Sequence, residues 1–187
     1  KEGTDDCWRV EDGLLTLNHE YKGGGDLVTN KVYENYILNL EWKISRAGNS
    51  GILINVQEGS QFPKTYISGP EMQVLDNKDA SDNKKDTHLA GSLYDLVSCN
   101  PEFVHPAGEW NKVKIRQKDG HLTFWINTHE VVDIQIGSPE WNNLVANSKF
   151  GHGEKYTKYF GKFLKGHIAL QDHGHRVWFR NIQIREL

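Results

Sequence analysis

The chain has 187 residues, of which 37% are apolar and 25% are charged, and its formal net charge is −3. This length suits one domain with a full hydrophobic core and is short for two, so we expect a single domain over residues 1–187. The sequence carries no basic stripe or arginine-rich arm, which argues against a nucleic-acid partner. Its apolar runs, such as that at 51–54, are too short to span a membrane.

The two cysteines, Cys7 and Cys99, lie far apart in the sequence. They could form a disulfide, and closing so long a loop would stabilise the fold by about 4–5 kcal/mol in the chain-entropy model. The chain starts at Lys1 without a methionine, which is compatible with a processed N-terminus. We therefore expect an exported protein, located in the periplasm, on the cell surface or outside the cell.

Short runs of strand-forming residues recur between turn signals along the chain. Residues 36–44 alternate between apolar and polar side chains, as a strand with one buried face does. Residues 69–76 and 111–116 show the same alternation, and residues 121–127 follow after a turn as a hairpin partner. Many short strands at regular spacing predict an all-β sandwich or barrel.

One short helix is expected near the end of the chain. Ser138 is a favourable N-cap, Pro139 suits the first helical position, and the helix should run to about Ala146. Residues 77–88 are polar and rich in Asp and Lys, which predicts an exposed loop. A long loop in a compact domain is often functional.

Polar residues on several predicted strands fall opposite the core residues of the same strand. In residues 69–76, Met72 and Val74 should face the core, which places Glu71 and Gln73 on the outer face. Asp76 joins them only if a bulge near residues 74–75 shifts the alternation. The same reasoning places Glu41, Lys43, Gln171, His173 and Arg180 on outer faces. If these strands are neighbours, they form one polar patch of acids, bases and amides.

A divalent metal ion is the one cofactor that the sequence suggests. Asp172-His173-Gly174-His175 forms a predicted turn in which His173 and His175 are candidate ligands and Asp172 could orient one of them. Two histidines without a clear third ligand are a weak signal for a metal site. A single hydrogen-bonded histidine beside an exposed one is the alternative.

A series of short motifs along nearly the whole chain resembles the 3-keto-disaccharide hydrolase family. The motifs are WRVEDG at 8–13, GDLVT at 25–29, EWKIS at 41–45, GNSGI at 48–52, YISGPEMQVLDN at 66–77, AGSLYD at 90–95, PAGEWN at 106–111, GHIALQDHG at 166–174 and FRNI at 179–182. Each motif is weak, but their order and number are specific. The resemblance implies a concanavalin-like jelly roll of two antiparallel sheets, and exported proteins of bacteria that degrade glycans.

The resemblance also implies a carbohydrate substrate whose sugar is oxidised to a ketone at carbon 3. Such a ketone acidifies the hydrogen on carbon 2, so a base can remove it and the aglycone can leave carbon 1, after which water adds. The site needs a general base, a group that stabilises the enolate and a proton donor. The candidate catalytic residues are Glu71 and His173, and the candidate substrate-binding residues are Lys43, Asn49, Tyr66, Gln73, Asp76 and Gln171. The sequence leaves open which group takes the proton.

Two other functions are compatible with a sandwich of this kind. Retaining glucanases of similar architecture carry two catalytic carboxylates on one strand, and Glu71 and Asp76 have that spacing. Gln73 and Asp76 replace residue types those enzymes use, which disfavours this mechanism. A lectin-like module that binds sugar without catalysis is the third alternative, because a fold does not determine a function.

Overall fold

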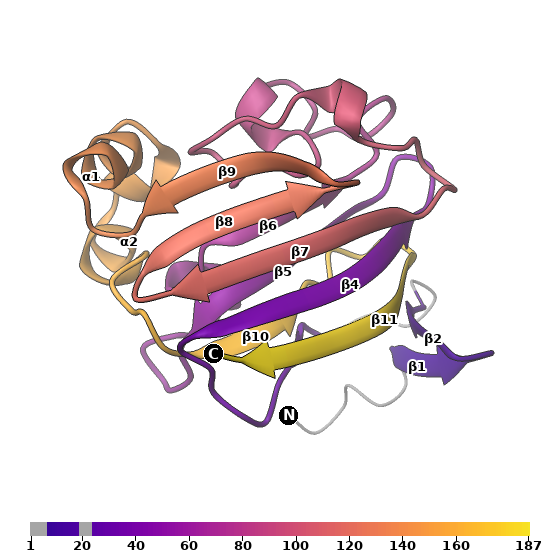
Figure 1. Cartoon of the computed structure of the whole chain (residues 1–187), viewed down its shortest axis with the longest axis horizontal. Coiled ribbons are helices and arrows are strands. Elements are labelled where there is room, and N and C mark those ends of the chain that lie inside the picture. Colours follow the sequence, from indigo (N-terminus) through magenta and orange to yellow (C-terminus); the bar gives the residue numbers. More distant parts are fainter. Residues whose placement is uncertain (1–6, 19–23) are drawn as a thin grey trace.

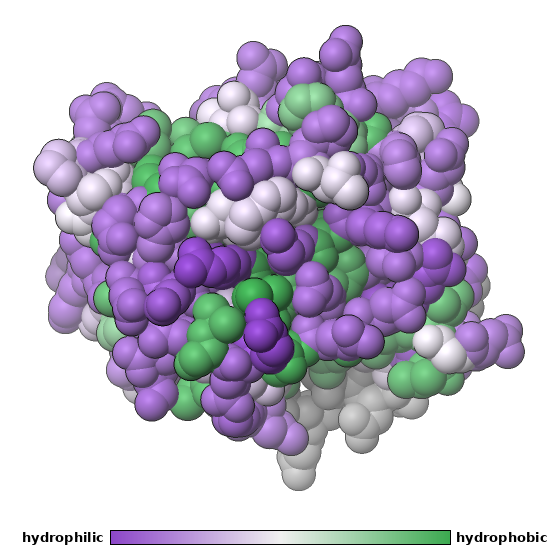
Figure 2. All heavy atoms as spheres, viewed as in Figure 1, coloured by the Kyte–Doolittle hydropathy of each residue, from purple (hydrophilic) through white to green (hydrophobic). Residues whose placement is uncertain are grey.

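The computed structural model describes residues 7–18 and 24–187. Within these residues, the chain forms a sandwich of two antiparallel sheets, as predicted (Figure 1). The larger sheet has seven strands in the order β1-β2-β11-β4-β7-β8-β9, and the smaller has four in the order β3-β10-β5-β6. The outer face of the larger sheet, which is turned toward the viewer, is largely hydrophilic (Figure 2).

The strands of the larger sheet are β1 (Trp8–Glu11), β2 (Leu14–Leu17), β4 (Tyr36–Ile44), β7 (Asn111–Lys118), β8 (His121–Ile126), β9 (His129–Gln135) and β11 (Val177–Glu186). Those of the smaller sheet are β3 (Leu27–Val28), β5 (Asn49–Val56), β6 (Glu71–Leu75) and β10 (His167–Leu170). The helices are α1 (Pro139–Ala146) and α2 (Glu154–Tyr159), with 3-10 turns η1 (Thr65–Ile67), η2 (Asp86–His88), η3 (Pro101–Phe103) and η4 (Lys149–Gly151).

The core lies between the sheets and follows the predicted alternation. On β4, Leu38, Leu40 and Trp42 are at most 2% exposed, whereas Asn39 between them is exposed. Met72 on β6 is fully buried in the same cluster. Apolar burial on one face of each sheet is the main stabilising contribution that such an arrangement provides.

The smaller sheet differs from the larger one because it is covered on both faces. All residues of β5 and β6 are buried, whereas burial alternates along β7. The segment after β6 returns along its edge, where the Tyr94 N–H donates to the Glu71 carbonyl and the Gly91 N–H donates to the Gln73 carbonyl. This return places Tyr94 beside the first residue of β6.

Turns and helix caps follow the chemistry of their residues. Asp119 and Gly120 both have positive φ, which is typical of the two-residue turn of a hairpin, and they join β7 to β8 as predicted. The predicted helix is α1, and the Ser138 hydroxyl accepts the Trp141 N–H at 3.1 Å. The structure adds a second short helix, α2, to the one that the sequence predicted.

The structure contains no disulfide between Cys7 and Cys99, although both are buried. Cys7 packs against Gly24, whereas Cys99 packs against Gly91 beside η3, so the two cysteines belong to different parts of the fold. Burial raises the pKa of the Cys99 thiol to about 11. Within the described residues, no helix combines the length and the apolar character needed to cross a membrane.

Candidate functional site

A cavity of about 280 Å³, here called the site cavity, opens on the outer face of the four-stranded sheet. Its lining residues are Asn49, Tyr66, Glu71, Gln73, Asp82, Tyr94, Lys149, Tyr156, Gln171 and His173. Those that were candidates from the sequence are Asn49, Tyr66, Glu71, Gln73, Gln171 and His173. The strands β5 and β6 supply Asn49, Glu71 and Gln73. Residues adjacent in sequence to Glu71 and Gln73, such as Met72, point to the core, so these two side chains point to the cavity.

Glu71 is the carboxyl group at the centre of this arrangement. It is only 7% exposed, and burial raises the pKa of its carboxyl group to about 8, although the positive charge of Lys149 opposes this shift. The side chain lies over Gly51, where an added Cβ would be 2.0 Å from the Glu71 Oε1. None of the hydrogen bonds among the described residues involves the carboxyl oxygens of Glu71. The carboxyl group is therefore available to a bound molecule.

Lys149, the first residue of η4, brings a cation to the same cavity. Its Nζ lies 4.1 Å from the centre of the Tyr94 ring and 5.0 Å from that of Phe150. Burial lowers the pKa of Lys149, while the negative charges of Glu71 and Asp95 counteract the shift. Burial thus favours the neutral forms of both the acid and the amine, and their mutual attraction favours the charged forms.

Tyr94 begins a chain of hydrogen bonds that leads away from the cavity. Its hydroxyl donates to Asp82 Oδ2 at 3.0 Å, Asp82 Oδ1 lies 2.8 Å from His88 Nδ1, and His88 Nε2 lies 2.9 Å from Asp95 Oδ1. Burial and the negative charge of Asp82 raise the pKa of Tyr94. Burial of Asp95 acts against ionisation, but hydrogen bonds from the Lys149 N–H, His88 and Lys85 keep its pKa below the usual range.

His173 lies at the rim of the site cavity, in the turn that follows β10. Its ring is nearly parallel to that of His175, with 5.9 Å between their centres. Asp172 does not orient either imidazole, because its carboxylate accepts the N–H groups of Gly25 at 3.0 Å and Gly174 at 2.9 Å. The carboxylate fixes the turn instead. Residues 7–18 and 24–187 hold no cluster of three or more His, Cys, Asp or Glu that could bind a metal ion.

Comparisons with known proteins show the family of this chain. The profile of the family described as "3-keto-alpha-glucoside-1,2-lyase-like domain" matches residues 1–185. A curated 3-keto-disaccharide hydrolase from Bacteroides thetaiotaomicron is 36% identical over 96% of this chain and 70% of its own length. The chain belongs to the 3-keto-alpha-glucoside-1,2-lyase-like family.

Solved structures share the sandwich fold of this family member. A candidate glycosyl hydrolase from Parabacteroides distasonis superposes with a TM-score of 0.87 at 32% identity, covering 97% of this chain and 83% of the other. A Bacillus subtilis protein with a galectin-like fold matches at a TM-score of 0.58 and 10% identity, over 96% of this chain and 86% of its own. The latter likeness shows the jelly-roll fold alone.

Lys43 does not join the site cavity of this family member, so the predicted convergence was wrong for this residue. It lies on β4 in the seven-stranded sheet, paired with Trp178, and its Nζ lies 4.7 Å from the Trp178 ring centre and 5.0 Å from that of Trp110. Glu41 and Arg180 share this sheet as an ion pair. The single polar patch expected from the sequence is therefore divided between the two sheets.

Asp76 also lies outside the cavity lining. The register between β5 and β6 is regular from Glu71 to Leu75, so the bulge that would have turned Asp76 outward is absent from this pair. Its carboxylate instead accepts the N–H groups of Ala47 at 2.8 Å and Lys78 at 3.1 Å. Asp76 stabilises the turns on either side of the sheet edge.

Four cavity residues escaped the sequence analysis, namely Asp82, Tyr94, Lys149 and Tyr156. They come from loops, from the 3-10 turn η4 and from the short helix α2, where no strand alternation predicts the direction of a side chain. The one signal that pointed to them was the polar loop 77–88, which contributes Asp82 and the buried His88. Tyr94 also belongs to one of the family motifs, at 90–95, but the motif did not indicate a role for this residue.

Proposed function

We propose that this domain cleaves glycosides whose sugar carries a ketone at carbon 3, by elimination followed by addition of water. The proposal rests on family membership and on one structural observation. That observation is the buried Glu71 carboxyl group, whose pKa is raised to about 8 and whose oxygens face an otherwise polar cavity. A carboxylate with a raised pKa is a stronger base, and carbon-bound hydrogen requires a strong one.

In the proposed reaction, the Glu71 carboxylate removes the proton from carbon 2, and the electron pair of that C–H bond forms an enolate with the carbon 3 ketone. The ketone then re-forms, a double bond forms between carbons 1 and 2, and the bond from carbon 1 to the glycosidic oxygen breaks. That oxygen takes a proton from His173 at the cavity rim. The hydroxyl group of a water molecule then adds to carbon 1 while its proton goes to His173, and Glu71 returns a solvent-exchanged proton to carbon 2. Both residues are restored, and the net reaction is hydrolysis.

Lys149 and Gln73 are the proposed partners of the enolate. Donors aimed at an oxygen that gains charge act most strongly in a site shielded from water, and both residues line the site cavity. Lys149 serves as the cation and Gln73 as a neutral amide donor. The proposal also carries the expectation of an exported protein, which stays a prediction.

A glucanase-like mechanism receives less support. It needs a second carboxylate within about 5–5.5 Å of the first. Asp76, the residue with the appropriate sequence spacing, is bound to backbone N–H groups and does not line the cavity. A binding module without catalysis would not need a carboxyl group with a perturbed pKa, although such groups also occur in structural networks.

The proposal is tested by incubating the protein with a 3-keto-glucoside, its unoxidised parent and a laminarin-type glucan. We expect release of the aglycone from the first substrate alone, and incorporation of solvent deuterium at carbon 2 of the product. Cleavage of the unoxidised glycoside at a comparable rate without exchange at carbon 2 would favour the glucanase-like mechanism. Binding without cleavage of any of the three would favour the lectin-like alternative.

A further inference from the structure

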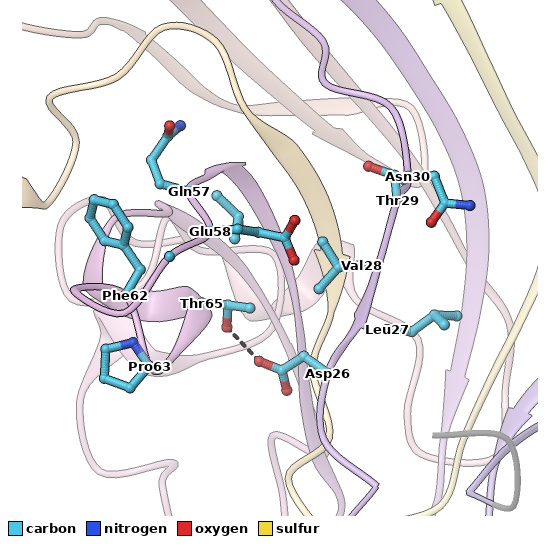
Figure 3. A pocket seen from close by; sticks show the side chains of 12 residues that line it. Asp26, Leu27, Val28, Thr29, Asn30, Gln57, Glu58, Phe62, Pro63 and Thr65 are labelled. Carbon is cyan, nitrogen blue, oxygen red and sulfur yellow. Dashed lines mark hydrogen bonds between the residues drawn. The ribbon is translucent and has the colours of Figure 1, made fainter. Parts of the chain in front are cut away.

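A second, larger cavity lies next to the site cavity. It has a volume of about 440 Å³ and lies between β3 and the segment that follows β5. Figure 3 shows Glu58 extending between Val28 on one side and Phe62 and Thr65 on the other. Nothing in the proposed chemistry uses these residues.

A third, smaller cavity of about 140 Å³, here called the connecting cavity, has lining residues in common with both. The connecting cavity shares Tyr66, Gln171 and His173 with the site cavity. It shares Asp26 and Thr65, among others, with the larger cavity. The three cavities therefore adjoin one another in a row, here called the groove, and His173 lines both the site cavity and the connecting one.

The wall of this groove is held in place by its own hydrogen bonds. Asp26 accepts the Thr65 hydroxyl (Figure 3) and the Asp172 N–H, the latter at 2.8 Å, which ties β3 to η1 and to the turn that carries His173. Asp172 in turn accepts the Gly25 N–H. A wall with a fixed shape binds a ligand at a lower entropic cost than a mobile one.

We propose that the larger cavity binds the sugar that leaves, with the oxidised ring of the substrate in the site cavity and the second ring beyond His173. This inference rests on the proposed function, because the position of His173 as donor to the leaving oxygen fixes the point of cleavage. The part of the substrate on the far side of that oxygen then enters the connecting and larger cavities.

The chemistry of the larger cavity fits a pyranose. The side chain of Glu58 is 61% exposed, and one of its oxygens lies 3.5 Å from His167 Nε2, so the carboxylate can accept sugar hydroxyls. Phe62 is half-buried and held edge-on by Tyr159, with 4.9 Å between ring centres. An aromatic ring can cover the apolar C–H face of a sugar while the carboxylate fixes its hydroxyls.

The experiment compares Glu58→Ala and Phe62→Ala with wild type on two substrates, a 3-keto-disaccharide and the methyl glycoside of the same 3-keto sugar. We expect each variant to lower kcat/KM for the disaccharide by about 3- to 30-fold and to leave that for the methyl glycoside unchanged. Glu130→Ala, which removes an exposed carboxylate from β9 on the other sheet, is the matched control and should change neither value. Equal losses on both substrates, or no loss on the disaccharide, would overturn the subsite.

A binding measurement separates this inference from the proposed function. If wild type cleaves neither 3-keto substrate, the proposed function fails, and titration calorimetry with the unoxidised disaccharide and methyl glycoside still tests the cavity. We expect wild type to bind the disaccharide more tightly, and Glu58→Ala to weaken that binding alone by about 3- to 30-fold. Equal affinity of wild type for both sugars, or no effect of the substitution, would refute the second binding site.

Discussion

The outer faces of the two sheets carry the same types of residue in different electrostatic settings. On the seven-stranded sheet, Glu41 accepts hydrogen bonds from Arg180 at 2.7 and 2.9 Å and from Asn181 at 3.0 Å. Burial of Glu41 acts against ionisation, but these bonds keep its pKa below the usual range. On the four-stranded sheet, burial of Glu71 is not offset in this way, and its pKa rises to about 8.

This difference shows that a strand position alone does not make a carboxylate reactive. Both glutamates lie opposite core residues, so the alternation of their strands is equivalent. What differs is whether other segments of the chain cover the outer face of the sheet at that position. Segments after β6 and around η4 enclose Glu71, whereas Glu41 lies on the uncovered face of its sheet with its charge neutralised.

The largest effect should come from exchanging the two glutamates for the neutral amide. Glu71→Gln removes the proposed base and should lower turnover of a 3-keto-glucoside by about 10²- to 10⁴-fold, which is the usual contribution of a positioned base. Glu41→Gln serves as the control and should keep wild-type turnover. Steady-state kinetics measures the turnover of both variants, and circular dichroism checks that they fold. Comparable losses of turnover in both variants would show that Glu71 and Glu41 do not differ in their role.

A smaller but still large effect is expected at Gly51. A methyl group there would lie 2.0 Å from Glu71 Oε1 and 2.7 Å from its Cδ, so the carboxyl group must move aside in Gly51→Ala. Because the displaced atoms are the end of a flexible side chain, the fold should survive. A displacement of about 1 Å can cost 10²-fold in rate. Kinetics that match wild type in this variant would show that the position of the carboxyl group is unimportant.

The sequence predicted the sheets and much of the site cavity because both depend on alternation. Leu40 and Trp42 face the core, as does Met72, and Glu71 and Gln73 follow on the other face by the same rule. Alternation could not show which sheet a strand joins, so Lys43 was placed with residues that lie on the other sheet. It also says nothing about loops, and Lys149 and Tyr94 reach the cavity through long-range backbone contacts with no local pattern.

The raised pKa of Glu71 predicts a specific dependence of stability on pH. The folded protein holds this proton up to about pH 8, while the unfolded chain releases it near the ordinary value of 4.5. Between these values the folded state binds more protons, so this contribution to stability is present at low pH and is lost as pH rises through the folded pKa. The Glu71→Gln variant has no carboxyl group at this position, so this pH-dependent contribution to its stability is absent.

Urea denaturation of wild type and Glu71→Gln across this pH range checks the expectation. The free energy of unfolding of wild type should fall relative to the variant as the pH rises, by an amount on the order of a few kcal/mol, because each pKa unit corresponds to about 1.4 kcal/mol. Other groups titrate in both proteins and cancel in the difference. Parallel curves would mean that Glu71 is ionised in the fold like an exposed carboxylate.

The smallest effect should come from Lys43, the predicted site residue that the structure places on the seven-stranded sheet. Lys43→Met keeps the apolar stem between the rings of Trp110 and Trp178 and removes the charge that lies within 5.0 Å of both ring centres. A cation near an aromatic face at an exposed site contributes about 0.5–1 kcal/mol, so urea denaturation should detect a loss of about that size. Turnover should be unchanged, because Lys43 does not line the site cavity. A tenfold fall in kcat/KM with only this modest loss of stability would show that the two outer faces act together, and that the division between a structural face and a chemical face is wrong.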